Sequence, residues 1–306
     1  MKKFLINTLY FLLLVLVLLV IGEMAVRSMP NPYSVKKEAV SRYGRDTETL
    51  VLGASRSYYG IVADSLPNTL NLANISQNFE YDYRILEMTA DSMPNLKTIV
   101  LAVFMSSFFE PPMEKGPEWG LEIYYKIYSG IPKYNDFSFR NLELSRFSSY
   151  SGKLRNLLTR KKGPQSSPKG FGMDFEKSPG EAMIRAEAEK SAARQIFPHD
   201  YVDYNKRWFE KIAQFALNHN IRLILVEMPL TPDFVKALGN DSQIAMTKDI
   251  LNDLQQRYHF EHYDFERDPS FCYDDFHDPD HLDLQGAFKF TKMLRDSVLN
   301  VPCPAN

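Results

Sequence analysis

A chain of 306 residues with 44% hydrophobic and 13% aromatic residues is long and apolar enough for a large globular domain, which excludes a disordered protein. A formal net charge of -2 excludes a global basic field, so we expect no nucleic-acid partner. Only two cysteines, Cys272 and Cys303, exclude a disulfide scaffold and a thiolate-rich zinc site, and leave open one bridge or two free thiols.

The chain begins with an apolar segment. Lys2 and Lys3 precede a run without charged residues over 4–22, which is long enough to cross a hydrocarbon core. A cleaved signal peptide is the alternative, but this run is long for one and no clear cleavage site of small residues follows it. We therefore predict a single-pass anchor over residues 1–29 and a polar stalk over residues 30–46.

The remaining residues, 47–301, are predicted to form one α/β domain. Apolar runs bounded by turn residues alternate with helical patterns, as in βαβ units. We expect strands at 48–52, 69–74, 97–104, 221–229 and 260–265, and helices at 203–218 and 246–258. The predicted fold is therefore three-layer α/β/α with a mainly parallel, flavodoxin-like sheet of about five strands. Prolines and glycines break the pattern at about 110–200, where we expect an insertion that covers or shapes a substrate groove.

A candidate nucleophile, Ser55, follows the first predicted strand. Gly53 and Ala54 are small, so the chain can turn tightly there. Open α/β sheets bind ligands at the carboxyl ends of their strands, where a serine hydroxyl would be exposed on rigid backbone. An ordinary strand-to-helix turn with a serine cap is the alternative, and Ser57 is the second candidate nucleophile.

A candidate base, His281, lies near the other end of the chain. Asp278 precedes it by three residues, so its carboxylate can reach one imidazole nitrogen while the other nitrogen faces a serine. The same loop is rich in Asp and His, which are metal-ligand types. It lacks a recognised metal-binding spacing, so we expect neither a metal nor another cofactor.

Together the two motifs resemble the SGNH/GDSL superfamily of esterases and acyltransferases. Gly53-Ala54-Ser55 stands where that family has Gly-Asp-Ser, and Asp278-Pro279-Asp280-His281 stands where it has Asp-x-x-His. The resemblance is closest to the membrane-anchored extracytoplasmic branch, which includes the D-alanine transfer protein of teichoic acid and the alginate O-acetyltransferases. It implies a Ser55–His281–Asp278 triad that works through an acyl-enzyme.

The resemblance also implies groups that bind the oxyanion. The family has an Asn-x-Gly block after the second strand, and the glycine amide helps to form the oxyanion hole. Ala73 stands at the position of this glycine, and its N–H would act with the N–H of Ser55. Asn74 is expected to help, and Asn78 is a further candidate donor, although turns and caps are commoner roles for Asn.

A third family block, whose Asn supplies another oxyanion donor, has no match after the strand at 97–104. Ser106 or Ser107 is the candidate replacement. This departure and Ala73 favour the alternative function, a non-catalytic, membrane-tethered binding or assembly protein of the cell envelope.

The resemblance implies an esterase or O-acyltransferase that acts on an acylated small molecule or a cell-surface polysaccharide. The catalytic domain would face the periplasm or the cell exterior, and the apolar N-terminal segment would make the contact with the membrane. A polytopic membrane acyltransferase that supplies the acyl group is an expected partner.

Overall fold

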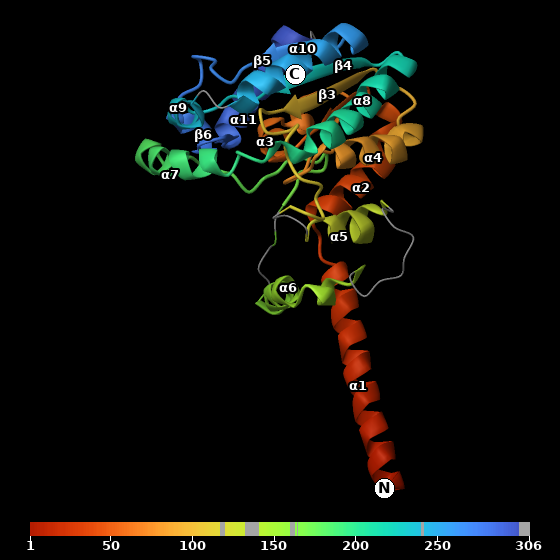
Figure 1. Cartoon of the computed structure of the whole chain (residues 1–306). Coiled ribbons are helices and arrows are strands. Elements are labelled where there is room, and N and C mark those ends of the chain that lie inside the picture. The colour runs from red at the N-terminus through yellow and green to blue at the C-terminus, as the bar shows by residue number, and fades with distance from the viewer. Residues whose placement is uncertain (117–119, 132–140, 160–162, 164, 240–241, 300–306) are drawn as a thin grey trace.

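A five-stranded, all-parallel sheet forms the centre of the molecule (Figure 1). The computed structural model describes residues 1–116, 120–131, 141–159, 163, 165–239 and 242–299. The strands are β1 (Thr49–Leu52), β2 (Thr69–Asn71), β3 (Thr98–Val103), β4 (Arg222–Glu227) and β5 (Glu261–Asp264). Their order, β2-β1-β3-β4-β5, is the flavodoxin-like order. The α/β class and the parallel sheet are thus confirmed, and each strand lies within its predicted range.

Helices cover both faces of the sheet because successive strand side chains point to opposite faces. Leu50 and Leu52 of β1 pack into one apolar cluster with α4 (Phe79–Thr89), α8 (Val202–Asn218) and α10 (Ser242–Tyr258). On the other face, Val51 belongs to a second cluster. This cluster includes residues of α7 (Glu181–Ala193) and α11 (Leu284–Leu294). The arrangement gives the three layers expected from the sequence.

The C-terminal part of the domain ends with α11 and a π-helical turn, Arg295–Leu299. The carboxylate of Asp283 caps α11 by accepting a hydrogen bond from the N–H of Gly286 at 2.8 Å. Cys303 lies outside the described residues, so the structure leaves open whether it is bridged.

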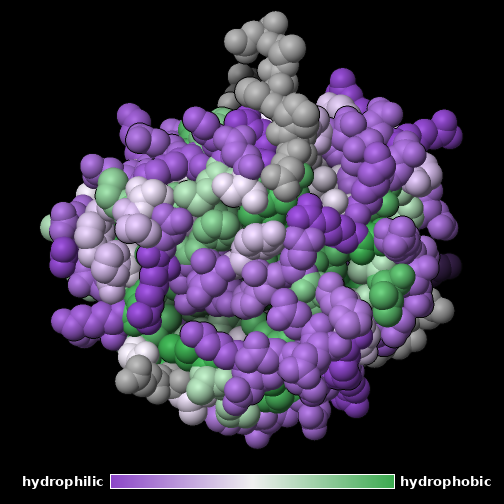
Figure 2. Space-filling model, turned by 90° about the horizontal axis from the view of Figure 1, so that it is seen from above, coloured by the Kyte–Doolittle hydropathy of each residue, from purple (hydrophilic) through white to green (hydrophobic). Residues whose placement is uncertain are grey.

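The N-terminal helix α1 (Lys2–Arg27) projects from the domain (Figure 1). It is long and apolar enough to cross a membrane, and none of its most apolar window is buried. Seen from the opposite end of the molecule, the surface is mostly hydrophilic (Figure 2). The molecule is therefore polar at one end and has an exposed apolar helix, α1, at the other.

Residues 30–46, which we expected to be a polar stalk, pack onto the domain. Helix α2 (Pro32–Tyr43) occupies most of this segment, and its cap, Asn31, accepts hydrogen bonds from the N–H groups of Tyr33 and Ser34 at 3.1 and 3.0 Å. Tyr33 and Ala39 are buried in the same cluster as Leu50. The buried residues of α2 are few and lie far apart in a mostly polar segment, so the sequence did not predict this helix.

The region at 110–200 forms two parts. Near α1 lie α5 (Glu122–Tyr124) and α6 (Phe147–Thr159), whereas α7 packs on α9 (Pro232–Leu238). Short 3-10 turns lie at Gly44–Asp46, Ala63–Ser65, Ala90–Ser92, Glu143–Ser145, His199–Tyr201 and Tyr273–Asp275, and a π turn lies at Tyr125–Ser129. The second part of this region reaches α3 (Ser55–Gly60), where Phe175 stacks on Tyr59.

Candidate active site

The turn after β1 presents Ser55 as the first residue of α3 (Ser55–Gly60). Gly53 has φ +114°, and a Cβ there would lie 2.9 Å from the carbonyl oxygen of Ala102 in the neighbouring strand. Only glycine therefore fits the turn without strain. The N–H of Gly53 donates to Asp82 Oδ1 at 2.8 Å, so α4 also holds this turn in place.

A buried polar network supports Asp82. Gln77 Nε2 donates to Asp82 Oδ1 at 2.7 Å, and the hydroxyl of Tyr125 donates to Gln77 Oε1 at 3.0 Å. Burial raises the pKa of Asp82 to about 7, against the opposing effect of the hydrogen bonds from Gln77 and Gly53. The turn that carries Ser55 thus rests on a carboxyl group that titrates near neutral pH.

A small hairpin presents His281. Strands β6 (Phe276–Asp278) and β7 (His281–Leu282) pair in antiparallel fashion, with Asp278 opposite His281 across a two-residue turn. Thr231 fixes this turn, because both its N–H and its hydroxyl donate to the carbonyl of Pro279, at 3.1 and 2.9 Å. The cross-strand pairing across a two-residue turn explains why Asp278 precedes the candidate base by three positions.

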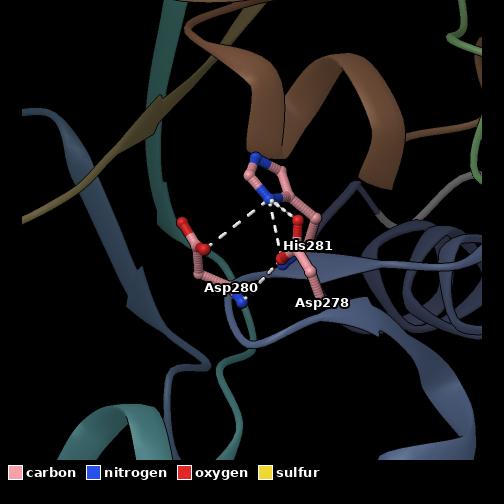
Figure 3. Close-up of side chains that lie close together, drawn as sticks. All are labelled: Asp278, Asp280 and His281. Carbon is pink, nitrogen blue, oxygen red and sulfur yellow. Dashed lines mark hydrogen bonds and ion pairs between the residues drawn. The ribbon is translucent and has the colours of Figure 1, made fainter. Parts of the chain in front are cut away.

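The structure brings Ser55, His281 and Asp278 together. The Ser55 Oγ lies 2.7 Å from His281 Nε2, across a sequence separation of 226 residues. On the other side of the ring, His281 Nδ1 lies 2.9 and 3.0 Å from the two carboxylate oxygens of Asp278 (Figure 3). The backbone N–H groups of Asp280 and His281 donate to Asp278 Oδ1 at 3.0 and 2.9 Å, which orients the carboxylate.

The pKa values of His281 and Asp278 are shifted from their ordinary values in opposite directions. Burial lowers the pKa of His281, but the charges of Asp280 and Asp278 and the hydrogen bond to Asp278 outweigh it, so the pKa is raised. Burial raises the pKa of Asp278, but the charge of His281 and its hydrogen bond outweigh this effect. The pKa of Asp278 is therefore lowered. The site therefore stabilises an imidazolium beside a carboxylate.

Asp280 is a second carboxylate near the imidazole (Figure 3). Its Oδ1 lies 3.7 Å from His281 Nδ1, and its Oδ2 lies 2.5 Å from Arg56 Nη2 in a buried ion pair. The guanidinium of Arg56 in turn lies 3.7 Å from the ring centroid of Phe104. Arg56 directly follows the candidate nucleophile in sequence, but nothing in the sequence predicted its ion pair with Asp280.

Aromatic rings also hold the imidazole. The ring of Phe175 stacks between Tyr59 and His277, with centroid distances of 3.8 and 3.9 Å. It meets His281 edge-on at 5.6 Å. Phe175 lies in the region at 110–200, where no motif marks it, so sequence analysis missed it.

A cavity of about 380 Å³ opens beside Ser55 and His281. Its lining combines polar residues, among them Ser76, Asn78, Glu110, Arg194 and Gln195, with the apolar residues Pro111, Met113 and Phe197. Asn78 Oδ1 accepts from the N–H of Tyr81 at 3.2 Å, and no described residue accepts a hydrogen bond from its Nδ2 group. Asn78 and Gln195 are therefore the two side-chain amides at this cavity whose N–H groups no described residue accepts.

Two of the predicted oxyanion-binding residues are not at this cavity. The N–H of Ala73 donates to Asn71 Oδ1 at 3.0 Å, and Ala73 is fully buried. Asn74 lines a separate apolar cavity of about 210 Å³ between α2 and α4. The assignment of Ala73 and Asn74 is therefore corrected. The chain turns inward after β2, and the Asn71 side chain uses the amide that the resemblance assigned to the oxyanion.

The second candidate nucleophile, Ser57, faces the interior. It is fully buried, and its hydroxyl donates to the carbonyls of Leu52 and Ala54 at 3.1 and 3.0 Å. This hydroxyl is not presented to the cavity at Ser55.

The two candidate replacements for the third-block donor do not line the cavity. Ser106 is buried, and its hydroxyl donates to the side-chain oxygens of Glu110 and Gln195, both at 3.2 Å. Ser107 Oγ accepts from the N–H of Phe104 at 3.0 Å. Neither is among the described residues that line the cavity. Ser106 thus positions two lining residues rather than contacting a substrate.

Two groups of described residues have oxygen or nitrogen atoms close enough to hold a metal ion. They are Asp278, Asp280 and His281, and Glu227, Asp264 and Glu266. In the first group both imidazole nitrogens of His281 are already hydrogen-bonded. A metal ion there would have to replace the bond to Asp278 or to Ser55.

Comparison with known proteins does not assign the chain to a family. No protein-family model matches it, and no curated protein is significantly similar to it in sequence. The resemblance of the two motifs to the SGNH/GDSL superfamily therefore stays a prediction.

Proposed function

We propose that this protein is a membrane-anchored serine esterase or O-acyltransferase. The observation that carries the proposal is the line of contacts from the Ser55 hydroxyl through the His281 imidazole to Asp278, with 2.7 Å between hydroxyl and imidazole. A serine at the start of a helix is common. A serine that is hydrogen-bonded to an imidazole, with a carboxylate orienting the ring, has the arrangement of an activated nucleophile.

In the proposed reaction, the Ser55 oxygen attacks the carbonyl carbon of an acyl ester while His281 Nε2 accepts the hydroxyl proton. Asp278 holds the ring in the correct orientation and stabilises the imidazolium. The raised pKa of His281 is consistent with this role, because the same charges that raise it stabilise the protonated ring. The imidazolium then protonates the leaving alcohol, and an acyl group remains on Ser55.

The negative charge on the former carbonyl oxygen needs hydrogen-bond donors. The backbone N–H of Ser55 lies in the first turn of α3, where intrahelical geometry provides no acceptor. The Nδ2 group of Asn78 lies at the same cavity. We assign these two donors to the oxyanion in place of Ala73 and Asn74.

The composition of the cavity favours a hydroxylated substrate such as a glycan. Its hydroxyl, amide and charged side chains can pair with sugar hydroxyls, and the apolar side chains of Pro111, Met113 and Phe197 can contact the acyl group. Release of the acyl group to water makes the protein an esterase, and release to a sugar hydroxyl makes it an acyltransferase. An acylated small molecule or a cell-surface polysaccharide is thus the proposed substrate.

The length and apolar composition of α1 support a location at the membrane. The proposed catalytic domain lies on the extracytoplasmic side. A domain tethered at the membrane can receive acyl groups from a polytopic membrane acyltransferase, which is the proposed partner.

A fluorophosphonate probe on the full-length protein tests the nucleophile. We expect the wild type to be labelled at Ser55, and Ser55→Ala and His281→Ala to lose the label while their melting temperatures stay nearly unchanged. Ser92→Ala is the matched control, because Ser92 is exposed and lies at the other cavity. It should be labelled like the wild type.

Two results would contradict the proposal. An adduct on Ser57 would move the nucleophile to the interior serine. A folded wild-type protein that takes up no label would favour the alternative, a tethered binding or assembly protein.

A further inference from the structure

Helix α6 exposes large apolar side chains near the membrane helix. Its apolar residues are Phe147, Tyr150, Leu154, Leu157 and Leu158, which form one stripe along a helix of 3.6 residues per turn. Tyr150 is buried, but Phe147 and Leu158 are 70% and 77% exposed. Exposed apolar residues gathered on one side of a helix indicate a surface that meets an apolar partner.

The opposite side of α6 faces the domain. The hydroxyls of Ser149 and Tyr124 lie 3.0 Å apart. Lys153 Nζ lies 2.6 Å from Glu143 Oε1 and 4.1 Å from the ring centroid of Tyr124. Ser149 and Lys153 project from the side of the helix opposite Phe147. The exposed apolar residues of α6 therefore point away from the domain.

The position of α6 along α1 coincides with the end of the apolar run. A Cβ at Gly22 would overlap the hydroxyl of Tyr150, so α6 packs closely at that point. One residue later, the carboxylate of Glu23 accepts hydrogen bonds from the N–H groups of Glu143 and Leu144 at 2.8 and 3.0 Å. Figure 1 shows α6 beside the domain-proximal end of α1, across its axis and below α5. An α1 that crosses a bilayer would place α6 at the level where it leaves the hydrocarbon core.

We propose that α6 is an interfacial helix that lies in the headgroup region of the leaflet from which α1 emerges. Phe147 and Leu158 insert toward the acyl chains, and the exposed Arg155 on the flank of the stripe meets lipid phosphates. The occupant of this surface is the lipid bilayer itself, because the surface continues directly from α1. The proposal rests on α1 crossing the membrane, but not on catalysis at Ser55.

An interfacial α6 would give the domain a second point of attachment. A single membrane-spanning helix can tilt in the bilayer and carry the domain with it. Helix α6 is bound to the domain through Ser149 and Lys153, and at the membrane surface it would resist that tilt. The cavity at Ser55 would then be held at a defined height and orientation above the membrane.

Spin-label accessibility in vesicles tests the proposal. The full-length chain carrying Cys272→Ser and Cys303→Ser is labelled at Leu158, at Leu12 in α1 or at the exposed Ser92, and reconstituted in phosphatidylethanolamine and phosphatidylglycerol. We expect the Leu158 and Leu12 labels to collide more with oxygen than with a water-soluble nickel chelate. The order should be reversed at Ser92.

The outcomes separate the two helices. If the Leu158 label collides more with nickel than with oxygen while the Leu12 label is deep in the bilayer, α6 is not interfacial. The membrane-spanning role of α1 would still hold. A Leu12 label exposed to nickel would overturn both. A Leu158 label shielded from both reagents would indicate contact with a second copy and would also overturn the proposal.

A pair of neighbouring variants gives an independent test. Phe147→Glu places a charge in the inserted stripe and should shift the Leu158 label toward water. Ser148→Glu adds the same charge one residue later, outside the stripe, and should leave the depth of the label unchanged. Equal depths in Phe147→Glu and the wild type would contradict the insertion.

Discussion

At the residue scale, His281 Nδ1 has two acidic neighbours with different roles. Asp278 makes the direct hydrogen bond, whereas Asp280 lies 3.7 Å away and is paired with Arg56. The charges of both raise the pKa of His281, and Arg56 opposes them. Asp280 is thus a positioning and tuning residue.

Asp280→Asn is expected to move the pH profile of the proposed esterase activity. His281 must be neutral to accept the proton from Ser55, so activity is lost as the pH falls through the pKa of His281. Removing the charge of Asp280 lowers that pKa, so the acid limb of kcat/KM for a chromogenic acetate ester should shift to lower pH.

The control for this shift is Asp274→Asn, a neutralised carboxyl on the same loop that is exposed. It should keep the wild-type profile. An acid limb that is the same in Asp280→Asn and the wild type would show that Asp280 does not tune His281.

At the element scale, the turn between β1 and α3 depends on α4. Asp82 Oδ1 accepts from both Gly53 and Gln77, so one carboxyl connects the turn that carries Ser55 to the neighbouring helix. The carboxyl is buried with a pKa raised to about 7. The strand-to-helix turn is therefore stabilised in a pH-dependent way.

Asp82→Asn is expected to remove this pH dependence. Between the ordinary pKa of about 3.9 and the folded-state value of about 7, the unfolded chain binds fewer protons than the folded one. The contribution of Asp82 to the free energy of unfolding therefore falls as the pH rises through that window. Asparagine keeps the acceptor and does not titrate, so the melting temperature of the variant relative to wild type should rise from pH 5 to pH 8.

Asp82→Ala separates the hydrogen bonds from the charge. It leaves the Gly53 N–H and the Gln77 amide without their acceptor, which should lower the free energy of unfolding by about 1–3 kcal/mol relative to Asp82→Asn at both pH 5 and pH 8. Identical pH dependence in the wild type and Asp82→Asn would show that Asp82 does not titrate in this range.

At the scale of the whole molecule, the junction between α1 and the domain is a set of hydrogen bonds rather than a free linker. Glu23 accepts from the N–H groups of Glu143 and Leu144 and lies 2.7 Å from Arg27 Nε. Arg27 Nη2 also donates to the carbonyl of Asn141 at 2.8 Å. The orientation of the domain relative to α1 is therefore defined by the fold.

Glu23→Ala is expected to loosen this junction without unfolding the domain, because it removes the acceptor of two backbone N–H groups at the edge of the structure. Pulsed electron resonance between labels at Thr8 and Ser148, in a cysteine-free background, should show a broader distance distribution. Glu38→Ala, at an exposed position on α2, should leave the distribution narrow. An unchanged width in Glu23→Ala would argue against a junction held by Glu23.

The sequence by itself determined the elements whose signal is local. The apolar run of 97–104 predicted β3 because a strand buried on both faces needs apolar residues throughout, and the helical spacing at 203–218 predicted α8 to within one residue. The sequence also predicted α1 as a possible membrane span, because the length and lack of charge of an apolar run can be read from the sequence alone. The three residues that meet at the candidate site were also chosen from two short motifs.

Only the tertiary structure decided which other groups reach that site. Ala73 occupies the expected position in the chain, but its amide is bonded to Asn71, whereas Asn78 lies at the cavity. Phe175 and Arg56 became visible only when the sheet order brought their elements beside the hairpin of His281. A periodic pattern depends on neighbours in sequence, whereas a donor or ion pair depends on contacts between residues that are distant in sequence and on what those residues already bind.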